Sequence, residues 1–504
     1  MRTLIIQALL FISATVFSQQ TEISAVLADA QTKEIIPYAT IQYGENKGVL
    51  TNDEGVFVLP EGISENNKIK VSSLGYEETE MLISELKDTL FIKPSSITLT
   101  EVFLSDKDLS GEEILEKVLA NIDSNYNFNY AKKRFFYRSS YFNDIKRLDM
   151  EVEESTIPEI DQKFVNNALT QIPRYVDSYM EYLGDFYGNY EDQKVQVIKI
   201  ANLYNPTNEQ GVEELGERME QIIKDNLGED TYVKIKSGLL GFKMDSEEFL
   251  EEMEEAEEPK EKTAEEKTKD SIKLYENLAN GIQSKLLASL KGMFWKDDIT
   301  FDVFQKSRKY EFEVEGYTQI GNDIAYVINF KPKRGADFKG KMFVSTEDFG
   351  LYRLDYDNVK PLKKFKLFGV SNKKDVFQGK MIFAKDQNDK YNLKYVERSS
   401  GNTFGVSRPL KILVKKGKWY WNKRLKELDL EMDIVASDVS KGQWIIYDEE
   451  EMDKEAYASV EVNNQFDYKK FKKYNAEFWD GYNVMEPNQA IKSFSAMDEA
   501  EDSE

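Results

Sequence analysis

Leu428-Asp-Leu-Glu-Met-Asp-Ile434 is the stretch that decides the fold. Apolar and acidic residues alternate in it, so one side of the segment is apolar and the other is charged. Similar alternation occurs at residues 310–314, 324–330, 352–356 and 391–395. Half-buried strands of an antiparallel sheet have this pattern. About nine such strands predict a large curved antiparallel sheet or half-barrel over residues 297–490, in a mainly β chain with helical connectors (α+β).

The first part of the chain has shorter strands and tighter turns. It reads Pro37-Tyr-Ala-Thr-Ile-Gln-Tyr-Gly44, then Thr51-Asn-Asp-Glu-Gly-Val-Phe57, then Val71-Ser-Ser-Leu-Gly-Tyr76. Asn and Asp tolerate turn geometry, and Gly supplies a positive φ. Short strands separated by turn signals predict a small β-sandwich. Its expected strands are residues 22–28, 38–43, 56–59, 68–73, 77–82, 89–93 and 97–104.

Four blocks of this region, residues 35–41, 48–57, 71–76 and 99–102, appear in the order typical of one family. They resemble the carboxypeptidase-like regulatory domain, a transthyretin-like sandwich found at the N-termini of exported Bacteroidota envelope proteins. The resemblance implies such a domain over residues 20–105. It implies no peptidase activity, because the zinc site of metallocarboxypeptidases lies in a different domain and uses His, and this chain has no His.

The N-terminus predicts export. A short charged start precedes an apolar run at residues 4–12, and small residues follow it, so residues 1–18 are expected to be a signal peptide. No later segment reaches the roughly 18 apolar residues of a membrane-spanning helix. The chain has no Cys, which excludes disulfides and an N-terminal lipid anchor. We therefore expect a periplasmic or outer-membrane-associated protein that is not a lipoprotein.

Composition excludes several classes of function. Without His or Cys there is no imidazole-based triad, no Cys-His dyad and no His-ligated zinc. We expect no catalytic residue, metal or cofactor site. The net charge is −24, all of it within residues 1–299, because residues 300–504 hold 35 acidic and 35 basic residues. So acidic a chain is not expected to bind nucleic acid.

The middle of the chain predicts both helices and strands, including a strand at residues 134–138. Residues 106–245 are mixed, with a helix starting at a Ser110–Glu113 capping box and another over residues 212–227. Residues 246–296 combine an acidic segment, either a solvated helix or a disordered linker, with an amphipathic helix over residues 271–294 that is expected to pack on the sheet. Residues 491–504 are expected to be an acidic disordered tail.

Residues 316–354 carry a second resemblance. Gly316-Tyr317, Tyr326–Pro332, Phe338–Val344 and Asp348–Leu354 resemble the repeating strands of outer-membrane lipoprotein carrier-type curved sheets. The resemblance implies a concave sheet able to hold an apolar ligand.

A basic stretch suggests a lipid contact. Residues 360–374 contain six Lys, two Phe and no acid. Phe in the bilayer interface and Lys on anionic head groups is a known mode of peripheral binding. The alternative is a polar loop whose Phe side chains pack inward. The candidate lipid or partner contacts are Lys363, Lys364, Phe365, Lys366 and Phe368.

An aromatic stretch near the C-terminus, residues 475–491, suggests a second contact. Trp479 and Tyr482 could stack on a sugar ring. The alternative is a latch that packs the end of the chain against the sheet.

These observations favour a non-enzymatic exported protein that binds an apolar ligand or an outer-membrane partner, lipid or protein, through the C-terminal sheet. The N-terminal sandwich would be an accessory interaction module. The alternative is a carbohydrate-binding or carboxylate-based carbohydrate-active protein, which requires two carboxyl groups at the base of a cleft. The oligomeric state is not predicted.

Overall fold

The computed structural model describes residues 23–44, 47–60, 62–95, 109–228, 230–238, 240–246, 264–333, 335–416 and 423–494. The chain is mainly β with helical connectors, as predicted. It divides into two compact units. Among the described residues, those within 1–96, 319–322 and 476–488 form the smaller unit, and those within 97–318, 323–475 and 489–504 form the larger unit.

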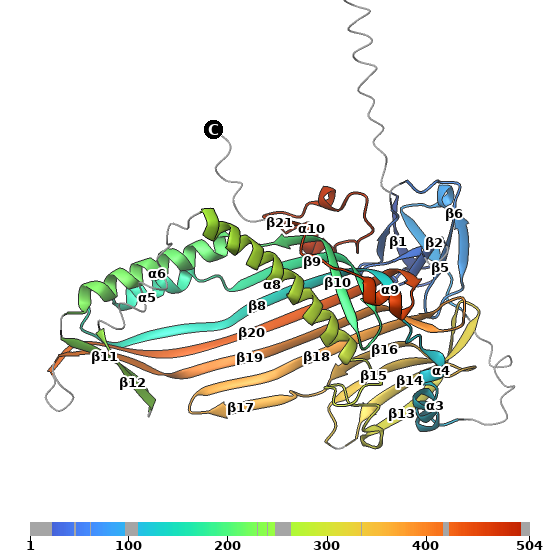
Figure 1. Cartoon of the computed structure of the whole chain (residues 1–504). Coiled ribbons are helices and arrows are strands. Elements are labelled where there is room, and N and C mark those ends of the chain that lie inside the picture. The colour runs from blue at the N-terminus through green and yellow to red at the C-terminus, as the bar shows by residue number, and fades with distance from the viewer. Residues whose placement is uncertain are drawn as a thin grey trace, which may run out of the picture. The chain divides into compact units, whose positions relative to one another are not determined.

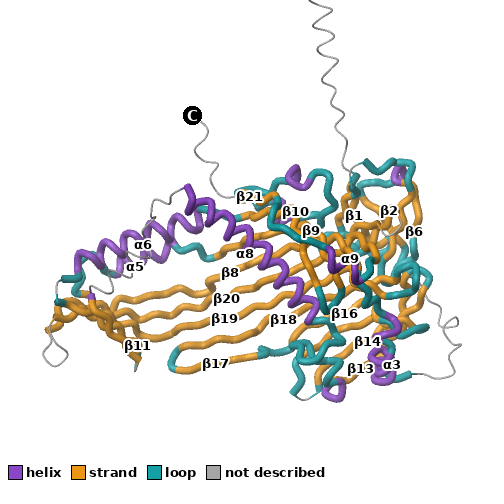
Figure 2. Tube along the Cα trace, viewed as in Figure 1, coloured by secondary structure: helices purple, strands orange, loops and turns teal. Residues whose placement is uncertain are grey.

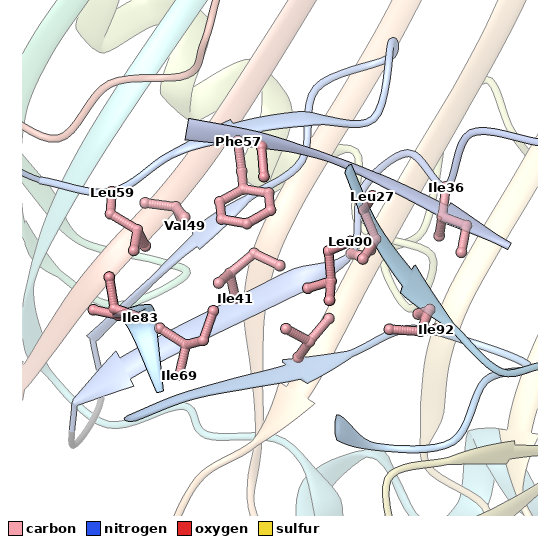
Figure 3. Close-up of a cluster of buried hydrophobic side chains, with 13 residues drawn as sticks. Leu27, Ile36, Ile41, Val49, Phe57, Leu59, Ile69, Ile83, Leu90 and Ile92 are labelled. Atoms are coloured by element: carbon pink, nitrogen blue, oxygen red, sulfur yellow. The ribbon is translucent and has the colours of Figure 1, made fainter. Parts of the chain in front are cut away.

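Within its described residues, the smaller unit contains seven strands in two sheets. One face of each sheet contributes apolar side chains to a common core, in which Leu27, Ile41, Phe57 and Ile69 are fully buried. Figure 3 shows these side chains pointing toward one another between the strands. The two sheets are β4 (Val56–Val58), β1 (Ser24–Asp29) and β7 (Thr89–Ile92), and β3 (Lys47–Leu50), β2 (Thr40–Gly44), β5 (Lys68–Ser72) and β6 (Thr79–Leu82).

These strands agree with the sequence prediction in six places. The predicted seventh strand, residues 97–104, lies outside the described residues, and the sequence missed β3. The C-terminal latch, within residues 475–491, contacts a different part of the molecule from the one predicted. Asn483 donates from Nδ2 to the hydroxyl of Tyr43 and to the carbonyl of Gly48, both at 3.4 Å. The latch therefore packs on the small sandwich, whereas the sequence suggested the large sheet.

The larger unit is built on one sheet in the strand order β13-β14-β15-β16-β18-β19-β20-β8-β9-β10-β21 (Figure 1). Its ladders from β14 to β10 are antiparallel, and β21 joins β10 in parallel. The strands are β8 (Ala131–Ser155), β9 (Tyr175–Gly188), β10 (Gln193–Leu203), β13 (Tyr310–Ile320), β14 (Asp323–Pro332), β15 (Phe338–Ser345), β16 (Leu351–Asn358), β18 (Val370–Lys385), β19 (Tyr391–Lys416), β20 (Lys423–Glu451) and β21 (Asp467–Phe471).

Two hairpins extend this sheet beside β19. β17 (Lys363–Leu367) pairs with β18, whereas β11 (Thr231–Ser237) pairs with both β12 (Leu240–Asp245) and β19.

The boundary predicted at residue 297 does not divide the fold. β8, β9 and β10, from the region predicted as a separate mixed segment, continue the same sheet beyond β20. β8 pairs with β20 along most of its length, from Ser155 opposite Leu428 to Ala131 opposite Glu451. No local pattern encodes a pairing between strands so far apart in sequence.

Helices α5 (Gln162–Gln171), α6 (Thr207–Asn226) and α8 (Ala264–Lys291) lie on one side of the large sheet. α8 places the Lys285 ammonium 5.3 Å from the Tyr137 ring centroid, and Trp444 packs against that ring at 4.3 Å. α5 and α6 cover Leu428 and Leu430.

Trp444, Leu430 and Leu428 share one side of β20, because its register with β19 is unbroken from Lys426 to Ile445. We call this side the apolar face and the opposite side the charged face. Figure 2 shows α8 crossing the long strands, with α5 and α6 farther along them.

The helix predictions hold where they are described. Ser110 and Glu113 form the predicted capping box of α3 (Gly111–Ala120), and the predicted amphipathic helix is part of α8. Residues 1–22, 247–263 and 495–504, which include the predicted signal peptide, most of the acidic segment and most of the tail, lie outside the described residues. The remaining helices are α4 (Ile122–Asn125), α9 (Lys454–Ser459), α10 (Gln489–Lys492), η1 (Ile83–Glu85), η2 (Ser307–Lys309) and η3 (Ala476–Trp479).

Candidate functional site

The basic stretch forms the β17–β18 hairpin, whose turn carries an unusual residue. Leu367 pairs with Val370, and the two residues between them, Phe368 and Gly369, have φ angles of 48° and 78°. Two left-handed residues make the turn that best suits a twisted hairpin, and Asn-Gly is its preferred sequence. The Cβ of Phe makes this conformation unfavourable. Turn propensity therefore does not account for Phe368.

The apolar side chains of the hairpin lie on the apolar face of the sheet. Phe365 is opposite Asn372 of β18, which is opposite Phe404 of β19. Directly opposed residues in a sheet project to the same side. Phe365, Leu367, Phe368 and Phe404 are 52%, 50%, 62% and 43% exposed. α5, α6 and α8 leave this part of the apolar face uncovered.

Lysines surround these apolar side chains. Lys364 and Lys366 alternate with Phe365 and Leu367 and so project to the charged face. Lys363 is opposite Lys374, and Lys364 is opposite Lys373. Within the described part of the chain, these five lysines have no carboxylate partner.

The pKa of Lys374 is shifted by this environment. Burial lowers its pKa, and the charges of Lys363 and Arg398 lower it further. The hairpin is therefore a cationic structure that nearby carboxylates do not neutralise.

Lysine on an edge strand has a structural explanation too. It discourages pairing with the edge of another sheet. That explanation covers Lys364 and Lys366 but not the exposure of Phe365, Leu367 and Phe368. The predicted contact residues are thus brought together on one exposed hairpin, and the alternative in which the Phe side chains pack inward is not what the structure shows.

The aromatic pair near the C-terminus is placed differently. Trp479 is only 3% exposed and packs edge-on against Phe478 at 5.0 Å. Its ring is therefore not offered to a sugar from solvent. Tyr482 is half-buried, and its amide donates to the carbonyl of Trp479 at 2.9 Å.

The charged face carries a feature that sequence reasoning missed. One register row crosses the sheet from β14 to β9, and every residue in it is polar. Its first five members help to line an open groove of about 570 Å³. The row consists of Asn329, Lys341, Asp355, Lys380, Glu397, Gln443, Arg138 and Glu181.

Opposite charges alternate along the floor of this groove. Lys380 lies between Asp355 and Glu397, and burial lowers the pKa of its ammonium to about 8, aided by the charge of Arg353. Burial alone would raise the pKa of Glu397, but the charge of Lys441 at 3.1 Å and a hydrogen bond from Tyr395 hold it below its usual value. The Glu397 carboxylate is therefore suited to accept hydrogen bonds from a polar ligand.

The described residues contain no cluster of acidic side chains arranged to hold a metal ion. None of the described helices is long and apolar enough to cross a membrane. A comparison with known proteins gives no family model that matches this chain and no match among curated proteins.

Proposed function

We propose that this chain is an exported, non-enzymatic envelope protein that binds an anionic lipid surface through the β17–β18 hairpin of its large sheet. The observation that carries the proposal is Phe368, a bulky apolar residue held 62% exposed at a left-handed turn position. Packing does not retain such a residue there, and backbone preference opposes it. Strain kept at an exposed site supports a functional role.

The hairpin has the chemistry that lipid binding requires. Burying Phe365, Leu367 and Phe368 in the interface contributes roughly 1–2 kcal/mol for each side chain. Each Lys near an anionic surface contributes about 1 kcal/mol. The signal-peptide pattern and the resemblance of residues 20–105 to an envelope module support the location.

Co-sedimentation with phosphatidylcholine vesicles, with and without phosphatidylglycerol, tests the proposal. The wild-type chain should bind the anionic vesicles, less so as salt rises. Phe365→Ser combined with Leu367→Ser should weaken binding about tenfold or more. The matched control is Phe91→Ser, because Phe91 is 46% exposed and also has a lysine, Lys33, at 4.1 Å from its ring. Equal binding by both variants would reject the hairpin as the lipid site.

A second candidate function is binding of a polar ligand such as a carbohydrate in the groove. Asp355 and Glu397 lie on strands two positions apart, so their backbones are separated by about 10 Å. That spacing is close to the separation of an inverting glycosidase pair. A general acid needs a raised pKa, however, and that of Glu397 is lowered. The groove therefore favours binding over hydrolysis, and calorimetric titration with oligosaccharides of wild type and Lys380→Met tests it.

A further inference from the structure

A second hairpin repeats the design of β17–β18. β11 and β12 pair from Tyr232 opposite Asp245 to Ser237 opposite Leu240. Leu240 and Phe242 alternate with Gly241 and Lys243 on β12 and are 61% and 50% exposed. Lys234 and Lys243 are opposed and project to the other side of the hairpin. This hairpin is amphipathic in the same sense as the first one.

Both hairpins present their apolar side chains to the same face of the same sheet. Phe242 is opposite Ile235, which is opposite Ile412 of β19. Phe404 and Ile412 are an even number of residues apart, and the ladder between β19 and β20 is regular between them. Ile412 therefore shares the apolar face with Phe404, and so does Phe242.

Both hairpins also lie along the same edge of β19. β18 pairs with β19 as far as Val406, and β11 begins its pairing at Lys411. Between these positions, Arg408 donates to the carbonyl of Ser237, and the Ser237 hydroxyl donates to the carbonyl of Pro409 at 2.7 Å. These bonds fix the second hairpin to the strand that carries the first.

The charged side of the second hairpin is also rich in lysine, although Asp245 lies on it too. Lys234, Lys236 and Lys243 lie on its charged side, and the adjoining end of β19 adds Lys415. Burial lowers the pKa of Lys415, and the charges of Lys234 and Lys236 lower it further. An amphipathic element with a basic polar side fits an anionic lipid surface, whose head groups meet the lysines while the acyl region takes the apolar side.

We propose that the β11–β12 hairpin is a second lipid anchor, so that one edge of the large sheet engages an anionic bilayer at two points. The eight residues from Phe404 to Ile412 place these points about 26 Å apart along β19. Because both anchors belong to one sheet, insertion of the first makes insertion of the second intramolecular. This inference rests on the proposed lipid-binding function and adds Leu240 and Phe242 to its site.

The absence of Cys allows each anchor to be observed separately. Leu240→Cys, Phe368→Cys and, as a control on the exposed charged face, Glu151→Cys would each carry one polarity-sensitive fluorophore on the full chain. Anionic vesicles should shift the emission of the first two labels to the blue and leave the third unchanged. A shift at position 368 without one at position 240 would overturn the second anchor and leave the proposed function intact.

Other outcomes separate the two claims further. No shift at either position would overturn both. A shift at position 240 that required membrane protein, and never occurred with protein-free vesicles, would replace lipid by a protein as the occupant. Independently, Leu240→Ser combined with Phe242→Ser should weaken vesicle binding about tenfold while leaving the shift at position 368 in place.

Discussion

Apolar and polar residues alternate in the strands of the small sandwich and in those at the edge of the large sheet. The two regions differ in what the apolar sides of these strands contact. In the sandwich, two sheets face each other, and Leu27, Phe57 and Ile69 are hidden from solvent. At the edge of the large sheet, helices cover part of the apolar face and stop short of the hairpins beside β19. Phe365 and Phe242 remain half exposed there. Alternation thus shows that a strand has an apolar side, and only the tertiary fold decides what that side contacts.

The largest effect on stability is expected for Phe57→Ala, a substitution in the core of the sandwich. Phe57 is fully buried, so its loss should lower the free energy of unfolding of the sandwich by about 3–5 kcal/mol. Hydrogen-exchange mass spectrometry should show lost protection in β1, β2 and β5 and unchanged protection in β19. Lost protection in β19 as well would mean that the two units unfold together.

A substitution in the groove on the charged face is expected to change stability by an intermediate amount that depends on pH. The pKa of Lys380 falls from 10.5 in the unfolded chain to about 8 in the fold. Between these values the unfolded chain binds more protons, so this group makes stability rise with pH from about 8 to 10.5. Lys380→Met removes this group, so the free energy of unfolding of the variant should lack this rise between about pH 8 and pH 10.5.

Denaturant titrations of wild type and Lys380→Met at pH 7 and pH 10 measure this difference. The wild type should gain stability relative to the variant at the higher pH. A constant difference between the two proteins at both values would show that Lys380 is as well solvated in the fold as in the unfolded chain.

The smallest effect on stability is expected at the hairpin tip. Phe368→Asn supplies the residue that the turn prefers, so it should raise the free energy of unfolding by about 0.5–1 kcal/mol. The same substitution removes the most exposed apolar side chain of the site and should weaken vesicle binding. Thermal denaturation and co-sedimentation of one preparation give both values. Stabilisation without loss of binding would contradict a lipid role for Phe368.

Local signals predicted much of this molecule. The Ser110–Glu113 capping box, the strand at residues 428–434 and six strands of the sandwich follow from neighbouring residues. Long-range pairing did not follow. The groove row joins Asn329 to Glu181 only through the pairing of β20 with β8, which are far apart in sequence, and the latch joins Asn483 to Tyr43. The Lys363–Phe368 cluster was visible because it lies within one hairpin, whereas its relation to Phe242 depends on the register of β19.

The pairing of β8 with β20 has a consequence for how the chain folds as it is made. β8 ends at Ser155, and the strand that completes its ladder begins only at Lys423. During synthesis, β9 can cover one side of β8 early, while the other side stays unpaired until nearly all of the chain has emerged. Contacts so distant in sequence form slowly, and an unpaired strand edge invites association with other chains. Folding of this protein is therefore expected to need a holding factor, and dilute refolding should succeed where concentrated refolding aggregates.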